Sequence, residues 1–363
     1  MGVRLGIVGC GAFGSQFISL FAHHPLVSRL ALCDRDSTKL ATRAREHQVT
    51  ETYDSLDALC ASEVEAVALF TQPWLHAAQA VQVMNAGKHV YSAVPAAQSL
   101  EECDQVVEAS RRTGQYFMTG ETSYFRRECA WCREKAQQGA FGKIVLVEAE
   151  YLHDLDHGLR EVAQWRHGAD WGPDKTGGVP MHYPTHSMSY VVAITGAHAV
   201  SVSCLGFTLP GDDWFRTDTV SGNVQSNQTA LFELSNGAAG RILEYRRVGH
   251  RGAERVTRVY GTEGCWESGV AGSHWCTKSS DEPVDPPADF EPLPPALAAD
   301  RGGHGGSHAF LVNEFVMAVH DRRQPRLNAW EAVRYCAPGL VAHQSALRGG
   351  ERLPVPDWGD APP

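Results

Sequence analysis

Residues 6–17 read GIVGCGAFGSQF, and this stretch decides which fold the chain is expected to adopt. It places Gly9, Gly11 and Gly14 at the spacing G-x-G-x-x-G, between an apolar run and a helical pattern. Glycines so spaced permit a tight turn, a close approach of the backbone to a pyrophosphate, and close packing of helix on strand. The N-terminus of the following helix offers N–H groups and partial positive charge to phosphates. The stretch therefore predicts a dinucleotide site; the alternative is an ordinary glycine turn.

A second apolar run, LALCD (30–34), ends at Asp34. A carboxylate at this place accepts hydrogen bonds from the hydroxyl groups of an adenosine ribose, and its charge repels a 2′-phosphate. We therefore expect NAD as the cofactor. The neighbouring Arg35 keeps NADP open, because an arginine can accommodate that phosphate.

The rest of the chain divides by pattern into two expected domains, residues 1–124 and 125–363. The first alternates short apolar runs with helical patterns, which predicts a doubly wound parallel sheet. The second carries longer strands separated by turns, such as KIVLVEAEYL (143–152), and predicts an α/β domain with a large, mainly antiparallel sheet. Residues 277–306 hold six prolines without a usable period and are expected to form an excursion loop. The fold class is therefore α/β.

Composition excludes several classes of partner. The formal net charge of −10 disfavours nucleic acids and anionic membranes. No apolar run reaches the roughly 18 residues of a membrane span. Ten scattered cysteines predict free thiols and a cytoplasmic protein. Neither Cys129 with Cys132 nor His182 with His186 has the further ligands of a metal site, so we expect no metal.

The glycine motif together with LFTQPWLH (69–76) and GKHVYSAVP (87–95) resembles the Gfo/Idh/MocA oxidoreductase family. The resemblance implies a Rossmann domain, a second domain that binds a sugar or polyol, and a homo-oligomer (dimer or tetramer). It also implies which further residues lie along NAD. These are Ala12, Phe13, Thr71, Gln72, Pro73, His76, Ser92, Val94 and Pro95.

The chain departs from that family where its sugar dehydrogenases usually carry Glu-Lys-Pro. Here the three residues are Ala93, Val94 and Pro95, so the lysine that helps to deprotonate the sugar alcohol is missing. An aspartate that the family often places four residues before a histidine is also replaced, by His182 before His186. A dehydrogenase that releases NADH is therefore the alternative rather than the leading hypothesis.

Four further motifs, GETSYF (120–125), EYLHDLDHG (150–158), HYPTHSMSY (182–190) and GGHGG (302–306), are similar to those of glycoside hydrolase family 109. This resemblance implies a glycosidase with tightly bound, recycled NAD. It acts by transient oxidation at sugar C3, elimination across C1–C2, water addition and re-reduction. The candidate catalytic residues are Glu121, Tyr151, His153, Tyr183 and His186.

We assign His186 and Tyr183 to proton transfer at the C3 hydroxyl and C2, and the other three to leaving-group and water activation. The roles are exchangeable, and each residue has a structural alternative. Tyr183 and His186 could be hydrogen-bonded core residues, and His153 a satisfied histidine on a strand.

Basic residues near the expected pocket favour an anionic hexopyranoside, such as a sulfoquinovoside, because guanidinium groups recognise sulfonates and carboxylates. Surface salt bridges explain the same residues equally well. The candidate substrate-binding residues are Tyr124, Arg166, His167, Lys175, His182, Tyr245, Arg246 and His304. A non-catalytic NAD or sugar sensor is the remaining alternative.

Overall fold

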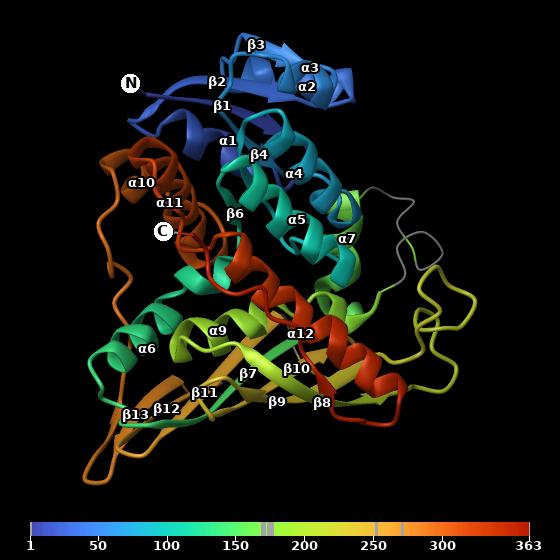
Figure 1. The fold of residues 1–363 in the computed structure, drawn as a ribbon, viewed down its shortest axis with the longest axis vertical. Coiled ribbons are helices and arrows are strands. Elements are labelled where there is room, and N and C mark those ends of the chain that lie inside the picture. Colours follow the sequence, from blue (N-terminus) through green and yellow to red (C-terminus); the bar gives the residue numbers. More distant parts are fainter. Residues whose placement is uncertain (1, 168–171, 173–177, 251–252, 270–271, 363) are drawn as a thin grey trace. The chain divides into compact units, whose positions relative to one another are not determined.

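The computed structural model describes residues 2–167, 172, 178–250, 253–269 and 272–362, with the side chains of 166–167 and 253–256 left out. The chain forms two compact units (Figure 1). Unit 1 comprises Met1–Arg126, Glu291–Val333 and Trp358–Pro363, and unit 2 comprises Arg127–Phe290 and Arg334–Asp357.

Unit 1 is built on a six-stranded parallel sheet with the order β3-β2-β1-β4-β5-β6. The order reverses between β1 and β4, which is where doubly wound sheets bind their ligands. The strands are β1 (Val3–Val8), β2 (Val27–Cys33), β3 (Glu51–Tyr53), β4 (Ala66–Leu69), β5 (His89–Ser92) and β6 (Phe117–Thr119). The helices between them are α1 (Ser15–Ala22), α2 (Ser37–Glu46), α3 (Leu56–Cys60), α4 (His76–Asn85) and α5 (Leu100–Thr113). The expected parallel sheet is confirmed.

A C-terminal segment completes unit 1, so the chain is not divided into two contiguous domains. Helix α11 (Ser307–Asp321) is buried along most of its length, and the ring of Phe315 lies 5.7 Å from that of Tyr91 in β5. A helix that is apolar on most sides needs cover on more than one side, and here α1 and β5 supply part of it. The first boundary, after Arg126, lies two residues beyond the expected one.

Unit 2 contains a nine-stranded sheet with the order β14-β13-β12-β11-β7-β10-β9-β8-β15. Its strands are β7 (Ile144–His153), β8 (Ala199–Phe207), β9 (Asn227–Leu234), β10 (Ala239–Tyr245), β11 (Ala253–Gly261), β12 (Gly264–Gly269), β13 (Gly272–Thr277), β14 (Asp281–Pro283) and β15 (Leu353–Pro354). β7 and β10 pair in parallel, and the other pairs are antiparallel. The mainly antiparallel sheet is therefore also confirmed.

Helices cover this sheet on one face. α6 (Arg127–Gln137) packs on α9 (Thr185–Thr195), and α9 packs on β7 and β10 (Figure 1). α7 (Arg160–His167) follows β7, and α12 (Ala329–Leu347) contributes to both units, since the division falls after Val333.

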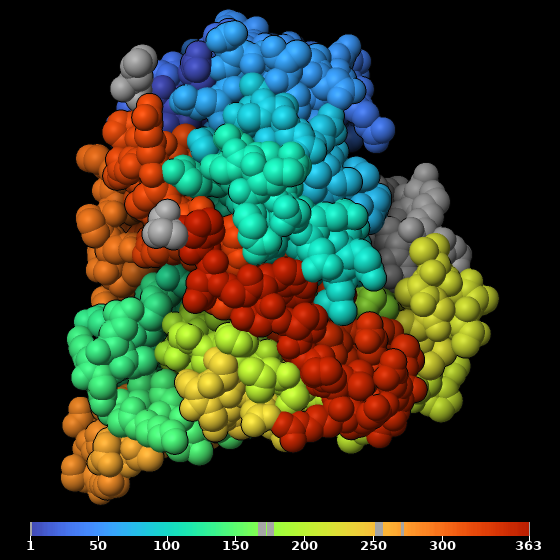
Figure 2. All heavy atoms as spheres, in the orientation of Figure 1, coloured from blue at the N-terminus to red at the C-terminus, as the bar shows by residue number. Residues whose placement is uncertain are grey.

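The expected excursion loop at 277–306 is not featureless. It contains β14, α10 (Pro295–Ala299) and a short 3₁₀ turn, η5 (His304–Gly306). The β12–β14 strands project at the margin of unit 2 (Figure 2). The short elements fit between prolines, because proline is accepted in the first turn of a helix and on edge strands.

Candidate functional site

The glycine turn of unit 1 fits a dinucleotide. Gly9 has φ +93°, and a Cβ there would lie 2.6 Å from the carbonyl oxygen of Phe70. A Cβ at Gly14 would lie 2.0 Å from the carbonyl oxygen of Gly9. At Gly11, by contrast, a Cβ would meet nothing within 4 Å. Two glycines are thus needed by the packing of the turn itself, and the third leaves the space that a pyrophosphate requires.

Asp34 follows β2 at the rim of this turn. Its carboxylate accepts hydrogen bonds from the backbone N–H of Cys10 (2.8 Å) and of Asp36 (2.9 Å). The two bonds hold the carboxylate in place, and each oxygen keeps a second lone pair for a ribose hydroxyl. Arg35 is exposed.

The turns after β4 and β5 are tied together by His76. The ring of His76 is buried, with Nδ1 2.8 Å from the carbonyl oxygen of Pro95 and Nε2 3.0 Å from that of Thr71. Burial lowers the pKa of His76 below its usual value, although both carbonyl groups oppose the shift. His76 therefore supports the wall on which NAD is expected, rather than facing it.

The other expected cofactor residues belong to the same turns. Gln72 precedes η1 (Pro73–Leu75), which begins at Pro73. The hydroxyl of Ser92 is fully buried and donates to the carbonyl of Ala93 (3.0 Å). Val94 is half-buried and follows Ala93, so this strand end provides no ionisable side chain.

Glu121 and Tyr124 also belong to unit 1. Glu121 is fully buried, and its Oε1 accepts a hydrogen bond from the backbone N–H of Ser123 (2.7 Å) at the start of η2 (Thr122–Phe125). The guanidinium group of Arg326 lies over the rings of Phe125 and Tyr124, 4.8 and 6.0 Å from their centroids. Of the remaining expected residues in this unit, His304 lies against Phe13 of the glycine turn, with 6.2 Å between the ring centroids.

Unit 2 brings four expected catalytic residues together. The hydroxyl of Tyr151 lies 2.8 Å from Nδ1 of His153, the next residue on the same face of β7. The ring of His186 lies edge-on to the rings of Tyr151 and Tyr183, with 5.2 and 5.3 Å between the ring centroids. His186 is in the first turn of α9, and Tyr151, His153 and His186 are all buried. The alternation of β7 and the start of α9 thus produce one cluster of two phenols and two imidazoles.

Arg246 belongs to this cluster by packing. Its guanidinium group lies 5.1 Å from the ring centroid of Tyr151 and forms an ion pair with Glu244 (2.8 Å). Glu244 is fully buried and accepts a hydrogen bond from the hydroxyl of Ser187 (2.7 Å), next to His186. We expected Arg246 at the substrate, but its charge is already paired within the protein.

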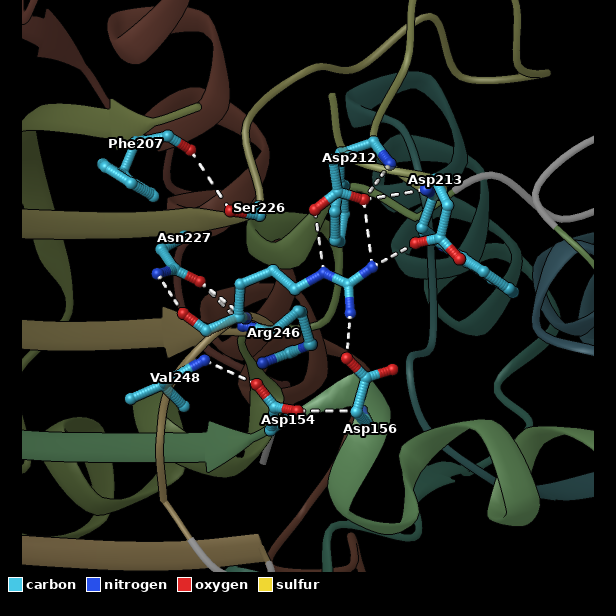
Figure 3. A network of polar contacts seen from close by, with 12 residues as sticks. Asp154, Asp156, Phe207, Asp212, Asp213, Ser226, Asn227, Arg246 and Val248 are labelled. Atoms are coloured by element: carbon cyan, nitrogen blue, oxygen red, sulfur yellow. Dashed lines mark hydrogen bonds and ion pairs between the residues drawn. The ribbon is translucent and has the colours of Figure 1, made fainter. Parts of the chain in front are cut away.

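A second arginine, Arg247, is also paired. It binds Asp212 (2.8 Å), Asp156 (2.7 Å) and Asp213, and Figure 3 shows these three carboxylates converging on one guanidinium group. Arg160 pairs with Asp156 (3.0 Å) and Asp213 (2.9 Å). Salt bridges within unit 2 therefore account for the described arginines of this region.

Two expected substrate-binding residues lie elsewhere in unit 2. The ring of His182 packs 5.2 Å from that of His343 in α12, and burial together with the charge of His343 lowers the pKa of His182 to about 4. Tyr245 follows Glu244 in β10, so strand alternation places it on the opposite face from Tyr151, where its hydroxyl contacts Thr229 (2.8 Å). Tyr245 is therefore not part of the Tyr/His cluster.

Three expected residues cannot be placed. Lys175 and the side chains of Arg166 and His167 lie outside the described residues. Conversely, Glu244 and Ser187 were not expected. Glu244 stands two residues before Arg246, one residue from the end of β10, and an acid at that spacing is the signal for an internal ion pair.

Three family models match the chain. The oxidoreductase family model with an NAD-binding Rossmann fold, Gfo/Idh/MocA, matches residues 3–121, and the Gfo/Idh/MocA C-terminal domain matches residues 130–267. The C-terminal domain of glycosyl hydrolase 109 matches residues 228–361.

Among the described residues, no helix is long and apolar enough to cross a membrane.

Known proteins give the same assignment. A glycosyl hydrolase family 109 protein of Shewanella sp. (strain W3-18-1) is 31% identical, over 98% of this chain and 85% of the relative. An alpha-N-acetylgalactosaminidase of Shewanella oneidensis is 31% identical over 205 residues, which are 52% of this chain and 43% of that protein. A levoglucosan dehydrogenase, solved with NADH and levoglucosan, shares the fold at a TM-score of 0.79 and 18% identity, over 98% of this chain and 100% of that one. The chain belongs to glycosyl hydrolase family 109.

Proposed function

We propose that the protein is an NAD-dependent glycosidase that cleaves a hexopyranoside through transient oxidation at C3. One observation carries the proposal: two phenols and two imidazoles cluster at the ends of β7 and α9, in a chain whose strand end after β5 has no base. A dehydrogenase needs one base for one alcohol. Elimination followed by water addition needs several groups that exchange protons, as imidazole and phenol side chains do.

NAD⁺, when bound at the glycine turn and Asp34, supplies the acceptance and later return of a hydride at C3. The chain's own residues move the protons. His186 and Tyr183 take the proton of the C3 hydroxyl and then the C2 proton, which the neighbouring ketone makes acidic. His153, Tyr151 and Glu121 protonate the departing aglycone and activate the water that adds at C1.

The cofactor is proposed to stay bound and to be recycled in each turnover. Because the hydride returns to the sugar, the reaction has no net redox change and needs no second substrate to reoxidise NADH.

The substrate class follows from charge. The described arginines near the Tyr/His cluster already have carboxylate partners, so their charges do not call for an anionic substrate and a neutral sugar is favoured. The relative named alpha-N-acetylgalactosaminidase supports an N-acetylhexosaminide as that sugar. An anionic hexoside such as a sulfoquinovoside is the second candidate, and Arg166, His167 and Lys175 would have to bind its charge.

The test is incubation of the protein with aryl N-acetylhexosaminides and aryl sulfoquinovosides in D₂O, with aglycone, NADH absorbance and C2 labelling followed together. Release of aglycone with deuterium at C2 and no net NADH is expected. Stoichiometric NADH without aglycone identifies a dehydrogenase instead, and no reaction on either series identifies a sensor.

A matched pair of variants locates the chemistry. His186→Ala should abolish turnover with NAD still bound, whereas His320→Ala, a change on α11 beside Asp321, should leave the rate unchanged. Retained activity in His186→Ala would remove His186 from the scheme.

A further inference from the structure

Two cysteines face each other across the antiparallel strands β12 and β13 of unit 2, which lie side by side (Figure 1). Cys265 and Cys276 are register partners, and directly opposite residues of an antiparallel pair project from the same face of the sheet. Their neighbours Trp266 and Trp275 project from the other face, where the two rings pack against Trp131 of α6, 4.9 and 5.3 Å between ring centroids. The two thiols are therefore neighbours on the sheet face opposite α6.

The spacing of this pair suits a disulfide. The backbone groups of Ser273 and Thr277 bond to residues that flank β14 (2.8 Å each), so those of Cys276 point to β12 and make Cys265–Cys276 a hydrogen-bonded pair. The Cα atoms of such a pair are about 5.5 Å apart, within the roughly 4.4–6.8 Å of a disulfide. The Cβ atoms of opposite residues are about 4.5–5.5 Å apart, slightly more than the roughly 3.5–4.5 Å of a disulfide. The strands must therefore approach a little when the bond forms, and strain of this kind makes a disulfide easy to reduce.

The two thiols are also partly open to solvent, unlike most cysteines of the chain. All ten cysteines lie among the described residues; seven are buried, and Cys60, Cys265 and Cys276 are half-buried. Cys60 lies in α3 of unit 1, so the half-buried thiols of unit 2 are the two that face each other. A small oxidant can therefore reach both members of this pair.

The two thiols differ in how firmly they hold their protons. The thiol of Cys276 donates to Oδ1 of Asp281 (3.3 Å), an oxygen that also lies 3.0 Å from Nδ1 of His274. Partial burial, this hydrogen bond and the charges of Asp281 and Glu267 raise the pKa of Cys276 to about 11. Because the thiolate is the nucleophile in disulfide exchange, the first attack falls to Cys265.

We propose that Cys265 and Cys276 form a reversible modification site, at which a low-molecular-weight disulfide such as oxidised glutathione converts the two thiols into an intrachain disulfide. The site lies on the open face of the unit 2 sheet, whereas Tyr151 and His186 lie on the face that the helices cover. It is therefore independent of the proposed function.

The exchange takes place in two steps. The Cys265 thiolate, after losing its proton to water, attacks one sulfur of the oxidant, so that a mixed disulfide forms and one small thiolate leaves. Cys276 gives its proton to this thiolate and attacks the sulfur of Cys265, which releases the second small thiolate to take a proton from water. Two electrons pass from the cysteines to the oxidant, which becomes two molecules of thiol.

The test treats the full-length protein with graded ratios of oxidised to reduced glutathione, alkylates the remaining thiols and digests the chain after glutamate. Cleavage after Glu267 separates the two cysteines, so the disulfide is detected by mass as a linked pair of peptides, lighter by two hydrogen atoms than the two thiol peptides together. We expect this linked pair at oxidising ratios. Reduced glutathione should restore both thiols, because the bond is easily reduced.

Single variants test the order of attack. Cys276→Ser should accumulate the mixed disulfide on Cys265, because the second thiol is gone. Cys265→Ser should leave Cys276 mostly unmodified over the same time. Adding Asp281→Asn to Cys265→Ser should speed the modification of Cys276 by at least about threefold, because the thiolate fraction rises faster than its nucleophilicity falls. Cys60→Ser is the matched control and should form the linked pair at the wild-type rate.

Complete alkylation of Cys265 and Cys276 at every ratio would overturn the proposal. So would a disulfide that joins either of them to a different cysteine, and equal glutathione adducts in the two single variants would overturn the order of attack. All of these results are peptide masses and none depends on aglycone release, so they are distinct from failure of the proposed function.

Discussion

At the scale of single residues, Arg246 is a buried charge that is paired within the protein and lies against the ring of a candidate catalytic tyrosine. Its guanidinium group lies on the face of the Tyr151 ring, and a cation there interacts favourably with the π system. Glu244 and Ser187 hold the group in place from β10 and α9. Under the proposed function, we expect Arg246 to position the Tyr151–His153 pair.

Arg246→Met should destabilise the protein by about 3–5 kcal/mol, because it removes the cationic partner of the buried Glu244 carboxylate. The double variant Glu244→Gln/Arg246→Met removes both charges and should recover most of that stability in chemical denaturation. Its rate of C2 deuterium incorporation should stay at least about tenfold below that of the wild type, and added guanidinium ion should partly restore it in Arg246→Ala. If the double variant exchanges at the wild-type rate, Arg246 is a structural counter-ion and nothing more.

At the scale of elements, Arg247 links the segment 209–226 to the residues that follow β7, because it pairs with Asp212 and Asp213 on one side and with Asp156 on the other. Asp212 accepts hydrogen bonds from the backbone N–H groups of Trp214 and Phe215 as well as from Arg247. Burial alone would raise the pKa of Asp212, but these donors outweigh it and lower the pKa below its usual value. Trp214 and Phe215 in turn pack on Leu155, so one arginine connects a loop, a hydrophobic cluster and a strand end.

Arg247→Leu should release this segment. We expect faster cleavage by a protease within residues 209–226 and a loss of about 1–3 kcal/mol in the free energy of unfolding, because buried Asp212 loses its charged partner and keeps only backbone donors. Arg216→Leu is the matched control, since Arg216 pairs with the exposed Asp218 in the same segment. Identical cleavage of the two variants would show that the aspartate cluster does not hold the loop.

Local sequence patterns predicted the helices and strands better than they predicted which distant elements pack together. The parallel sheet of unit 1 was expected, and Asp34 follows β2 as expected, because periodicity and glycine spacing are local. The parallel pairing of β7 with β10 and the return of α11 to unit 1 depend on which distant surfaces meet, and no local pattern encodes that choice. In the site, the Tyr/His cluster was predicted from its motifs. Tyr245 lies apart from that cluster, because alternation along β10 turns it to the opposite face of the sheet from Glu244.

At the scale of the whole molecule, each unit contains a half-buried histidine whose pKa is lowered. In unit 1, Nδ1 of His89 accepts a hydrogen bond from the backbone N–H of Tyr116 (2.9 Å), the ring stacks on that of Tyr116, and burial lowers its pKa to about 4. In unit 2, burial and His343 lower the pKa of His182 to about 4 as well. The ordinary value of a histidine pKa is about 6.5.

These two histidines should make the protein acid-labile in a defined range. Between about pH 6.5 and 4 the unfolded chain binds a proton at each position and the folded chain does not, so the free energy of unfolding rises with pH across this window. Each histidine contributes at most about 1.4 kcal/mol per pH unit. The double variant His89→Gln/His182→Gln should flatten the dependence measured by denaturant unfolding from pH 7 to 4.5, whereas His23→Gln, a change at an exposed ring, should keep the wild-type slope. An unchanged slope in the double variant would mean that acid lability comes from other groups, of which the buried His76 is the first to replace because its pKa is lowered in the same direction.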